Sequence, residues 1–206
     1  MRTHTKESQN TITPEKAILF LKEGNERFQN NLKANRNLLQ QVNETSEGQF
    51  PFATILSCID SRVSAELVFD QGLGDIFSVR IAGNFANDDI LGSIEFACKI
   101  AGSKVVVVLG HSSCGAVKGA CDNVQLGKLT GMLAKIKPAV NGVKGDFSDK
   151  SSKNEAFVQA VADKNVELTV QAIKDNSEVL KEMLDNKEIL IVGAMYNVAT
   201  GEVVFN

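Results

Sequence analysis

Two short motifs contain the residues of this chain that are best suited to chemistry. The first, Cys-Ile-Asp-Ser-Arg, runs from Cys58 to Arg62, and the second, His-Ser-Ser-Cys, runs from His111 to Cys114. Two thiolates and one imidazole form a borderline-soft ligand set that suits Zn²⁺. Three protein ligands leave one position open on a tetrahedral ion, as in catalytic zinc sites. The motifs therefore predict a site for one Zn²⁺ per chain, with Cys58, His111 and Cys114 as its ligands.

Each of these residues has a plainer explanation when it is taken alone. A cysteine after a strand is usually a small buried apolar residue, and a histidine in a turn usually caps it or lies on the surface. Their combination at two strand ends, with an acid and a base beside Cys58, favours the metal site. Cys98 and Cys121 instead fall on the apolar faces of predicted helices, so we expect them to be structural.

Motifs for other chemistry are incomplete. Gly110 and Gly115 have the spacing of a phosphate-binding loop, but the Lys and the Ser or Thr that should follow are missing. The arginine of a cysteine phosphatase is missing after Cys114. Gly72 and Gly74 lack the third glycine of a dinucleotide-binding fingerprint.

The elements that must position the two motifs alternate between strands and helices. Apolar, β-branched runs predict strands at 52–57, 76–81, 105–109, 189–194 and 202–205. Helical spacing of apolar residues predicts helices at 13–34, 65–70, 88–101 and 155–174, and others that begin near 115 and 177. This order indicates an α/β fold: a mainly parallel β-sheet flanked by helices, with an antiparallel edge strand at the C-terminus. Both motifs directly follow strands, where such folds place their sites.

The N-terminal part of the chain is less regular. A helical arm at 13–34 has a narrow apolar stripe and precedes every strand, so we expect it to pack on a partner chain. The polar segment before it, with His4, is expected to be mobile, and the Asn-rich stretch 30–48 to be a linker. Phe96 lies off the apolar face of helix 88–101, which indicates either a covering partner or a second buried face.

Composition limits the classes of function. The chain of 206 residues, with 43% hydrophobic and 23% charged residues, is expected to be one globular domain, 1–206. Its net charge of −3, without a basic block, makes nucleic acid an unsuitable partner, and no apolar run is long enough to span a membrane. Without the apolar core of a signal peptide we expect a cytoplasmic protein, or a periplasmic one if the chain is a processed, exported form.

Three blocks of the sequence resemble those of the β-class carbonic anhydrases. They are Cys58 to Arg62, Gly74 to Asn84 and Gly110 to Gly115, in the family's order. The likeness extends from about Thr13 to the last strand. It implies that Cys58, His111 and Cys114 bind Zn²⁺ and that the activity is that of a carbonate dehydratase.

The resemblance also implies roles for the acid and the base of the first motif. Asp60 either closes the site as a fourth ligand or, once water replaces it, orients the zinc-bound hydroxide. Arg62 would hold Asp60 away from the metal through a two-point charge-assisted contact. A structural ion pair within the turn is the alternative explanation for the pair.

Residues around the expected pocket match a plant-type subfamily. The resemblance implies that Gln49 donates a hydrogen bond to bicarbonate, aided by the backbone N–H of Gly115. Phe77 and Phe96 would line the carbon dioxide site from a neighbouring subunit, with Ala82 also in contact. The chain has no Trp, so we do not expect the noncatalytic bicarbonate site of the other subfamily.

The function expected from the resemblance is reversible hydration of carbon dioxide to bicarbonate and a proton by a zinc-bound hydroxide. Two alternatives stay open: a related zinc hydrolase acting on carbon disulfide or carbonyl sulfide, and a noncatalytic zinc-binding homologue. A homodimer with exchanged N-terminal arms, or a tetramer of two such dimers, is the expected assembly.

Overall fold

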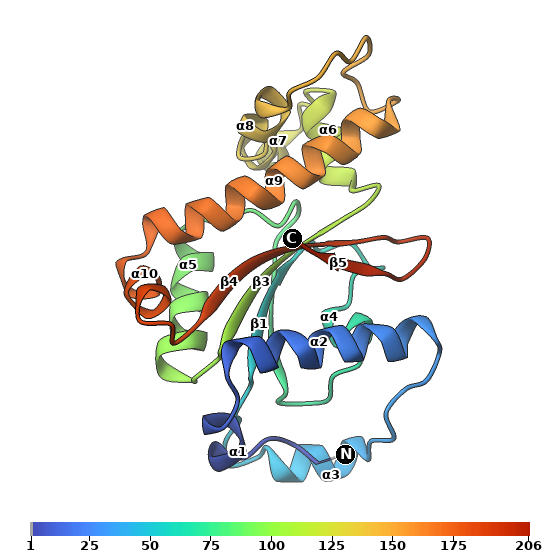
Figure 1. Cartoon of the computed structure of the whole chain (residues 1–206). Helices are drawn as coiled ribbons and strands as arrows, with labels where there is room; N and C mark the ends of the chain where they lie inside the picture. Colours follow the sequence, from blue (N-terminus) through green and yellow to red (C-terminus); the bar gives the residue numbers. More distant parts are fainter. Residues whose placement is uncertain (1) are drawn as a thin grey trace.

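A computed structural model describes residues 2–206, and a single five-stranded sheet forms its centre (Figure 1). The strands are β1 (Ala53–Ser57), β2 (Ile76–Arg80), β3 (Val105–His111), β4 (Leu190–Tyr196) and β5 (Val203–Phe205). Their order in the sheet is β2-β1-β3-β4-β5, and only β5 runs antiparallel to its neighbour. The mainly parallel sheet and the antiparallel C-terminal edge are therefore confirmed.

The register of β1 and β3 brings the two motifs together. Ser57 pairs with Leu109, so Cys58 and His111 leave the sheet from neighbouring strands at the same edge. All seven residues of β3 are buried, as its continuous apolar run predicts for a strand covered on both faces. This strand order, which the sequence did not determine, gives the fold a site at the carboxyl ends of β1 and β3.

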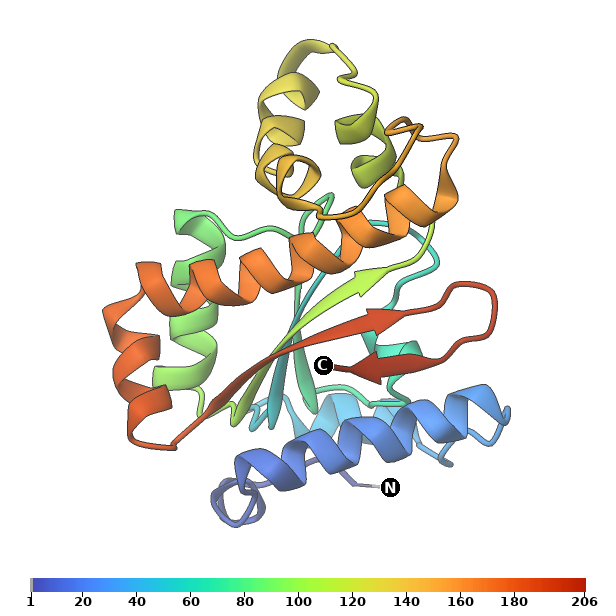
Figure 2. The same cartoon turned by 45° about the horizontal axis from the view of Figure 1, so that its top comes forward.

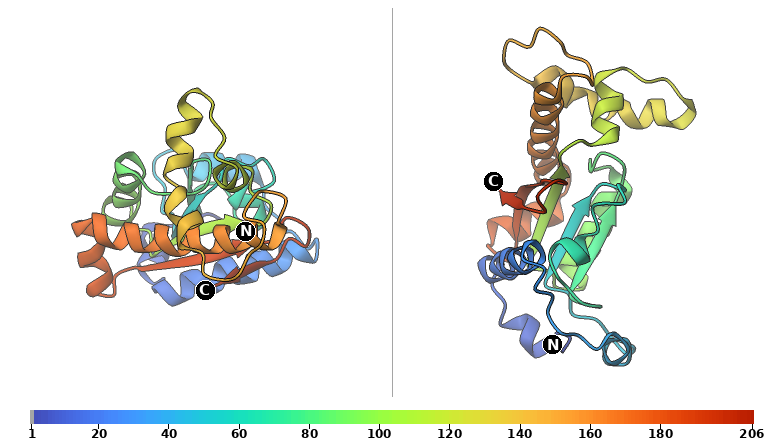
Figure 3. Two further views of the ribbon diagram at one scale, coloured as in Figure 1. Left: turned by 90° about the horizontal axis from the view of Figure 1, so that it is seen from above. Right: turned by 90° about the vertical axis from the view of Figure 1, so that its right-hand side faces the viewer.

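Helices cover both faces of the sheet (Figure 2). The helices α2 (Pro14–Gln29) and α4 (Ala65–Val68) pack on one face, and α5 (Asp88–Glu95), the central part of α9 (Glu155–Asn176) and α10 (Glu178–Asp185) on the other. A third apolar cluster lies beyond the carboxyl ends of the strands, where the first turns of α9 meet α6 (Gly115–Cys121), α7 (Gly127–Ala134) and α8 (Lys137–Gly142) (Figure 3). None of the helices in residues 2–206 is long and apolar enough to cross a membrane.

The predicted helix 88–101 is interrupted near its end. It is an α-helix only to Glu95, and a π-helical segment, η1 (Phe96–Ile100), follows. Cys98 is 2% exposed within this segment, which agrees with a structural role. Phe96 is 54% exposed, so residues 2–206 leave more than half of this side chain uncovered.

The N-terminal segment is more ordered than the sequence suggested. The helix α1 (Lys6–Asn10) forms where a mobile segment was expected, and α3 (Leu38–Glu44) forms within the expected linker. Both helices begin at side-chain caps, Thr5 and Asn37, which were the available signal. The His4 ring is held 5.4 Å from the ring of Phe52. The expectation of a mobile segment and a plain linker was therefore wrong.

Helix α2 packs on its own chain, whereas the sequence predicted that it would pack on a partner chain. Ala17 and Leu21 are fully buried in the same cluster as β1 and β3. At Gly24 an added Cβ would lie 1.8 Å from the carbonyl oxygen of Phe69, so the helix approaches the turn after α4 very closely. The order of elements along the chain did not reveal this contact, because the chain folds back to place β1 and α4 beneath the helix.

Candidate metal centre

The two motifs form one buried cluster of potential metal ligands. One donor atom from each of Cys58, His111 and Cys114 lies within 4.8 Å of the other two. The side chains come from the loop after β1, the last residue of β3 and the residue that precedes α6. All three residues are at most 4% exposed. The structure thus brings together the three residues that the motifs predict as ligands.

The spacing of the donors fits a tetrahedral zinc ion. The two sulfur atoms are 4.0 Å apart, close to the separation of about 3.8 Å that two Zn–S bonds of about 2.3 Å give at a tetrahedral angle. Nδ1 of His111 lies 3.0 Å from the carbonyl oxygen of Ser112, an acceptor that fixes Nδ1 as the protonated nitrogen. Nε2 of His111 is buried and has no hydrogen-bond partner among residues 2–206. An unprotonated, unpartnered Nε2 that faces two thiols is what a metal ion would require.

The local electrostatics favour deprotonation of Cys58. A hydrogen bond with the Cys114 thiol, helped by His111 and the backbone N–H of Gly83, lowers the pKa of Cys58 to about 4 although burial opposes this. The same contact raises the pKa of Cys114. A dication bound between the sulfurs favours the thiolate form of both, because a metal ligand must be deprotonated.

Asp60 and Arg62 form a two-point ion pair at the opening of the cluster. Nε of Arg62 donates to Oδ1 of Asp60 at 2.9 Å, and a terminal nitrogen donates to Oδ2 at 2.8 Å. These bonds hold the pKa of Asp60 well below its usual range, against the effect of partial burial. Oδ2 also lies 4.0 Å from Nε2 of His111. The carboxylate is therefore ionised and beside the ligands, but Arg62 binds both of its oxygens.

Arg80 and Gly83 belong to the site, and the sequence analysis gave neither a role. Arg80, at the end of β2, donates to the carbonyl oxygens of Cys58 and Asp60 at 2.9 and 2.7 Å. The N–H of Gly83 lies 3.4 Å from the sulfur of Cys58. Gly83 has a φ of +81°, and an added Cβ would lie 2.4 Å from the side chain of Ile136. The block from Gly74 to Asn84 contained both residues, but only contacts in space show what they bind.

The residues expected to surround the substrate divide into two groups. Ala82 precedes Gly83 in the loop that reaches Cys58, and Gly115 follows Cys114 at the start of α6, so both lie beside the ligands. Gln49, by contrast, is exposed and precedes β1, at the opposite end of that strand from Cys58.

The two aromatic residues of the expected pocket are also away from the ligands of their own chain. Phe77 lies on the edge strand β2, three positions before Arg80, and pairs with Thr54 of β1. The rings of Phe77 and Phe96 are 6.3 Å apart and line an open cavity of about 850 Å³ beside that strand. One chain therefore does not place Gln49, Phe77 or Phe96 at its own metal site.

Comparisons with known proteins agree on one family. The family model described as "Carbonic anhydrase" matches residues 53–203. Carbonic anhydrase 2 of Mycobacterium tuberculosis is 37% identical over 196 residues, which cover 93% of this chain and 92% of that protein. A carbonic anhydrase of Mycolicibacterium smegmatis is 34% identical over 197 residues, with 92% of each covered. A tetrameric β-carbonic anhydrase of Sordaria macrospora shares the fold, with a TM-score of 0.69 at 22% identity over 79% of this chain and 84% of that one.

Proposed function

The chain belongs to the β-carbonic anhydrase family of enzymes, and on this premise we propose that it hydrates carbon dioxide reversibly to bicarbonate and a proton. Cys58, His111 and Cys114 would hold one Zn²⁺. When bound, the ion would supply hydroxide near neutral pH, because zinc lowers the pKa of a coordinated water to about 7. The observation that carries the proposal is the buried Nε2 of His111, which has no hydrogen-bond partner within residues 2–206 and faces two thiols 4.0 Å apart.

The remaining residues of the motif would control access to the fourth position. With both oxygens bonded to Arg62, Asp60 is kept ionised and oriented as a hydrogen-bond acceptor. From its position 4.0 Å from Nε2 of His111, it would accept a hydrogen bond from the hydroxide and so orient it for attack. Ala82 and the N–H of Gly115 would contact the substrate from the two loops beside the ligands.

A second copy of the chain would complete the pocket. Gln49, Phe77 and Phe96 are the pocket residues that do not reach the ligands of their own chain, and β2, which carries Phe77, is an edge strand. Phe96 is 54% exposed beside it. A twofold contact along this edge would cover both rings and bring them, with Gln49, to the partner's metal site. The tetrameric assembly of the Sordaria macrospora relative is in keeping with such a dimer as a building unit.

Stopped-flow measurement of carbon dioxide hydration at pH 8.5, with zinc content determined on the same sample, tests the proposal. We expect fast hydration with about one zinc per chain. Asp60→Asn should keep the zinc and lose hydration by at least about a hundredfold, because the amide is no longer an anionic acceptor. Bound zinc without hydration would refute the proposed reaction, and carbon disulfide and carbonyl sulfide would then be assayed on the same sample.

A further inference from the structure

A second cavity, of about 150 Å³, lies at the end of the sheet opposite the metal centre. Phe52 precedes β1 and Cys58 follows it, so the strand separates the two sites by about 20 Å. The N-terminal segment, α2, the start of β1 and the turn before β2 form the wall of this second cavity. Its lining residues are Arg2, His4, Phe20, Glu23, Arg27, Phe52, Gln71 and Asp75.

One carboxylate oxygen of Asp75 lacks a hydrogen-bond donor among the described residues. The residue is 4% exposed, and its Oδ2 accepts a hydrogen bond from the N–H of Gly72 at 2.7 Å. Its Oδ1 is buried and has no hydrogen-bond partner among residues 2–206. A buried acceptor without a donor is costly, by about 1–3 kcal/mol or more for a charged group. An occupant that donates to Oδ1 would remove that cost.

Aromatic rings form the rest of the inner surface. The ring of Phe52 lies 5.6 Å from that of Phe20 and 5.4 Å from that of His4. The faces of aromatic rings attract cations, and their apolar surface suits a small organic group. Glu23 adds a second carboxylate, on the exposed side of α2.

The basic side chains around the cavity do not reverse its preference for a cation. Burial lowers the pKa of His4 and so favours its neutral ring. Arg36, whose charge also acts on Asp75, is paired with Asp70 at 2.6 Å. Nε of Arg27 lies 2.6 Å from Oδ2 of Asp70, so its charge is already paired. Arg2 is exposed at the rim. The buried part of the cavity is therefore defined by Asp75 and the rings, which favour a positively charged donor over an anion.

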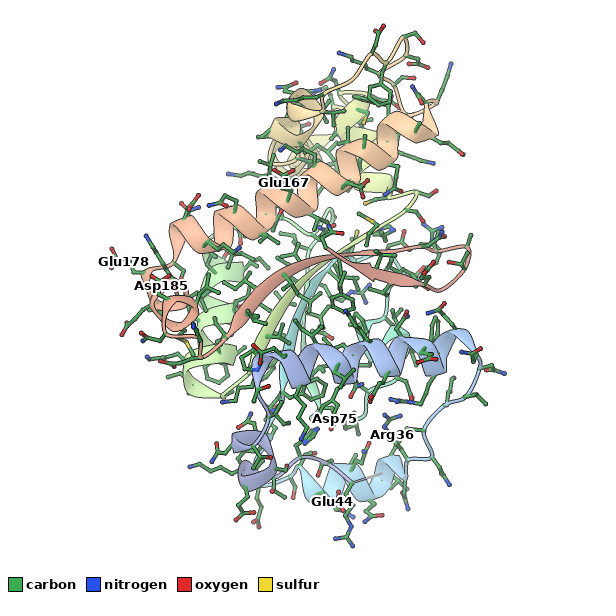
Figure 4. All side chains as sticks on the ribbon, in the orientation of Figure 1. Arg36, Glu44, Asp75, Glu167, Glu178 and Asp185 are labelled. Atoms are coloured by element: carbon green, nitrogen blue, oxygen red, sulfur yellow. The ribbon has the colours of Figure 1, made fainter. Side chains whose placement is uncertain are left out.

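We propose that this cavity binds a small organic cation that carries N–H donors, of the amidinium, guanidinium or primary ammonium type. An N–H group donates to Oδ1 of Asp75, and the apolar remainder lies against Phe20 and Phe52. The volume is that of about five water molecules, which suits a group of a few heavy atoms. Thr3 donates to Glu44 on α3 from its N–H and its hydroxyl, at 3.2 and 3.1 Å, and so holds the N-terminal segment over the cavity. Figure 4 shows Asp75 between α2 and the helix that carries Glu44.

Titration of the zinc-loaded protein with acetamidinium, followed by ¹H–¹⁵N NMR, tests this proposal. The reporter is the amide of Gly72, which donates to Asp75. We expect a saturable shift of this signal with acetamidinium. The neutral isostere acetamide and the anionic isostere acetate should bind there at least about tenfold more weakly, because neither combines a positive charge with N–H donors.

Variants locate the contact. Asp75→Asn should weaken acetamidinium binding at least about tenfold, because the charge-assisted bond is lost. Should that variant not fold, two exposed glutamates of α2 form a matched pair, since Glu23 lines the cavity and Glu26 does not. Glu23→Gln should weaken binding about two- to fivefold and Glu26→Gln should leave it unchanged. No saturable shift at Gly72, equal binding of acetamide, stronger binding of acetate, or equal effects of the two glutamate variants would overturn the proposal.

Discussion

At the scale of single residues, three of the four cysteines show how the environment of a thiol sets its role. Cys58 and Cys114 face each other beside His111, whereas Cys98 is enclosed by apolar side chains of α5, β3 and α10. Burial alone raises the pKa of Cys98 to about 12, while the neighbours of Cys58 lower its pKa to about 4. The same residue type is thus an inert core residue in one place and a candidate ligand in the other.

Serine substitutions separate these two roles. Cys58→Ser should bind less than about a tenth of the zinc of the wild-type protein, because a thiolate ligand is removed. Cys98→Ser should bind zinc normally but lower the free energy of unfolding by about 1–3 kcal/mol, because its hydroxyl is buried among apolar groups. Zinc content and urea unfolding of the two variants check this, and equal zinc loss in both would contradict the ligand assignment.

The sequence was sufficient for residues that act together within a short motif. Cys58, Asp60 and Arg62 lie within five positions, so their types and spacing indicated their chemistry before any fold was known. Arg80 acts only by hydrogen bonds to carbonyl oxygens twenty or more positions away. Such contacts have no signature in residue type, and it takes the pairing of β1 with β2 to show them.

At the scale of elements, β2 fixes the loop that carries the first motif. Arg80 donates to the carbonyl oxygens of Cys58 and Asp60, so the strand determines where both side chains point. We expect Arg80→Lys, which cannot make the same two-point contact, to reduce zinc affinity or carbon dioxide hydration by about 10- to 100-fold. Chelator competition and stopped-flow assays measure the two effects, and unchanged values in both would show that the loop holds its shape without Arg80.

A second element-scale contact joins α2 to the turn after α4. Asp70 is bonded to Arg27 and Arg36, both at 2.6 Å. Burial by itself would raise the pKa of Asp70, but these arginines and the N–H of Ala34 outweigh it and lower the pKa overall. A lowered pKa in the folded state means that this contribution to stability is present above the unfolded value of about 3.9 and is lost as the pH falls below it.

The substitution Asp70→Asn removes the negative charge of this carboxylate and keeps a side chain of similar shape. Asparagine also tolerates the φ of +44° found at this position, so the backbone need not change. At pH 7 the variant should be less stable by about 3 kcal/mol, because two buried or half-buried arginines lose their partner. The deficit should shrink as the pH falls below about 4. Urea unfolding of both proteins across pH 3–7 tests this, and a deficit that does not depend on pH would contradict the electrostatic explanation.

Element prediction failed where tertiary contacts alone decide the outcome. The strands were predictable because β-branched runs as in β3 are strong signals, and α9 because of its length and its apolar spacing. The helices α1 and α3 are short and polar, and only their caps indicated them. The packing of α2 on its own sheet depends on how the chain returns beneath it, which residue spacing cannot show.

At the scale of the whole molecule, the proposed active site is divided between two chains. The metal ligands are brought together within one chain, but Gln49 and Phe77 lie toward the other end of β1 and β2. The pocket residues were identifiable from the sequence by resemblance. Their assignment to a partner chain gains support from the single-chain geometry, since the described residues leave 54% of Phe96 exposed.

Subunit mixing tests this division. Cys58→Ser lacks the metal site, and Gln49→Ala lacks the expected bicarbonate contact, so each homodimer should be nearly inactive. Randomly mixed dimers should recover about a quarter of the wild-type activity per chain, because half of them are hybrids with one intact site of two. Recovery on unfolding and refolding the mixture together, but not on mixing folded samples briefly, checks the prediction. No recovery after refolding would show that Gln49 serves its own chain.

The most direct test of the central claim is to titrate zinc back into the metal-free protein while following carbon dioxide hydration. The account predicts no hydration above background without metal, a linear rise with added zinc, and a plateau at about one equivalent per chain. Cys114→Ser should show no such plateau. Hydration that persists in the metal-free protein, or a protein that takes up one equivalent of zinc and stays inactive, would contradict it.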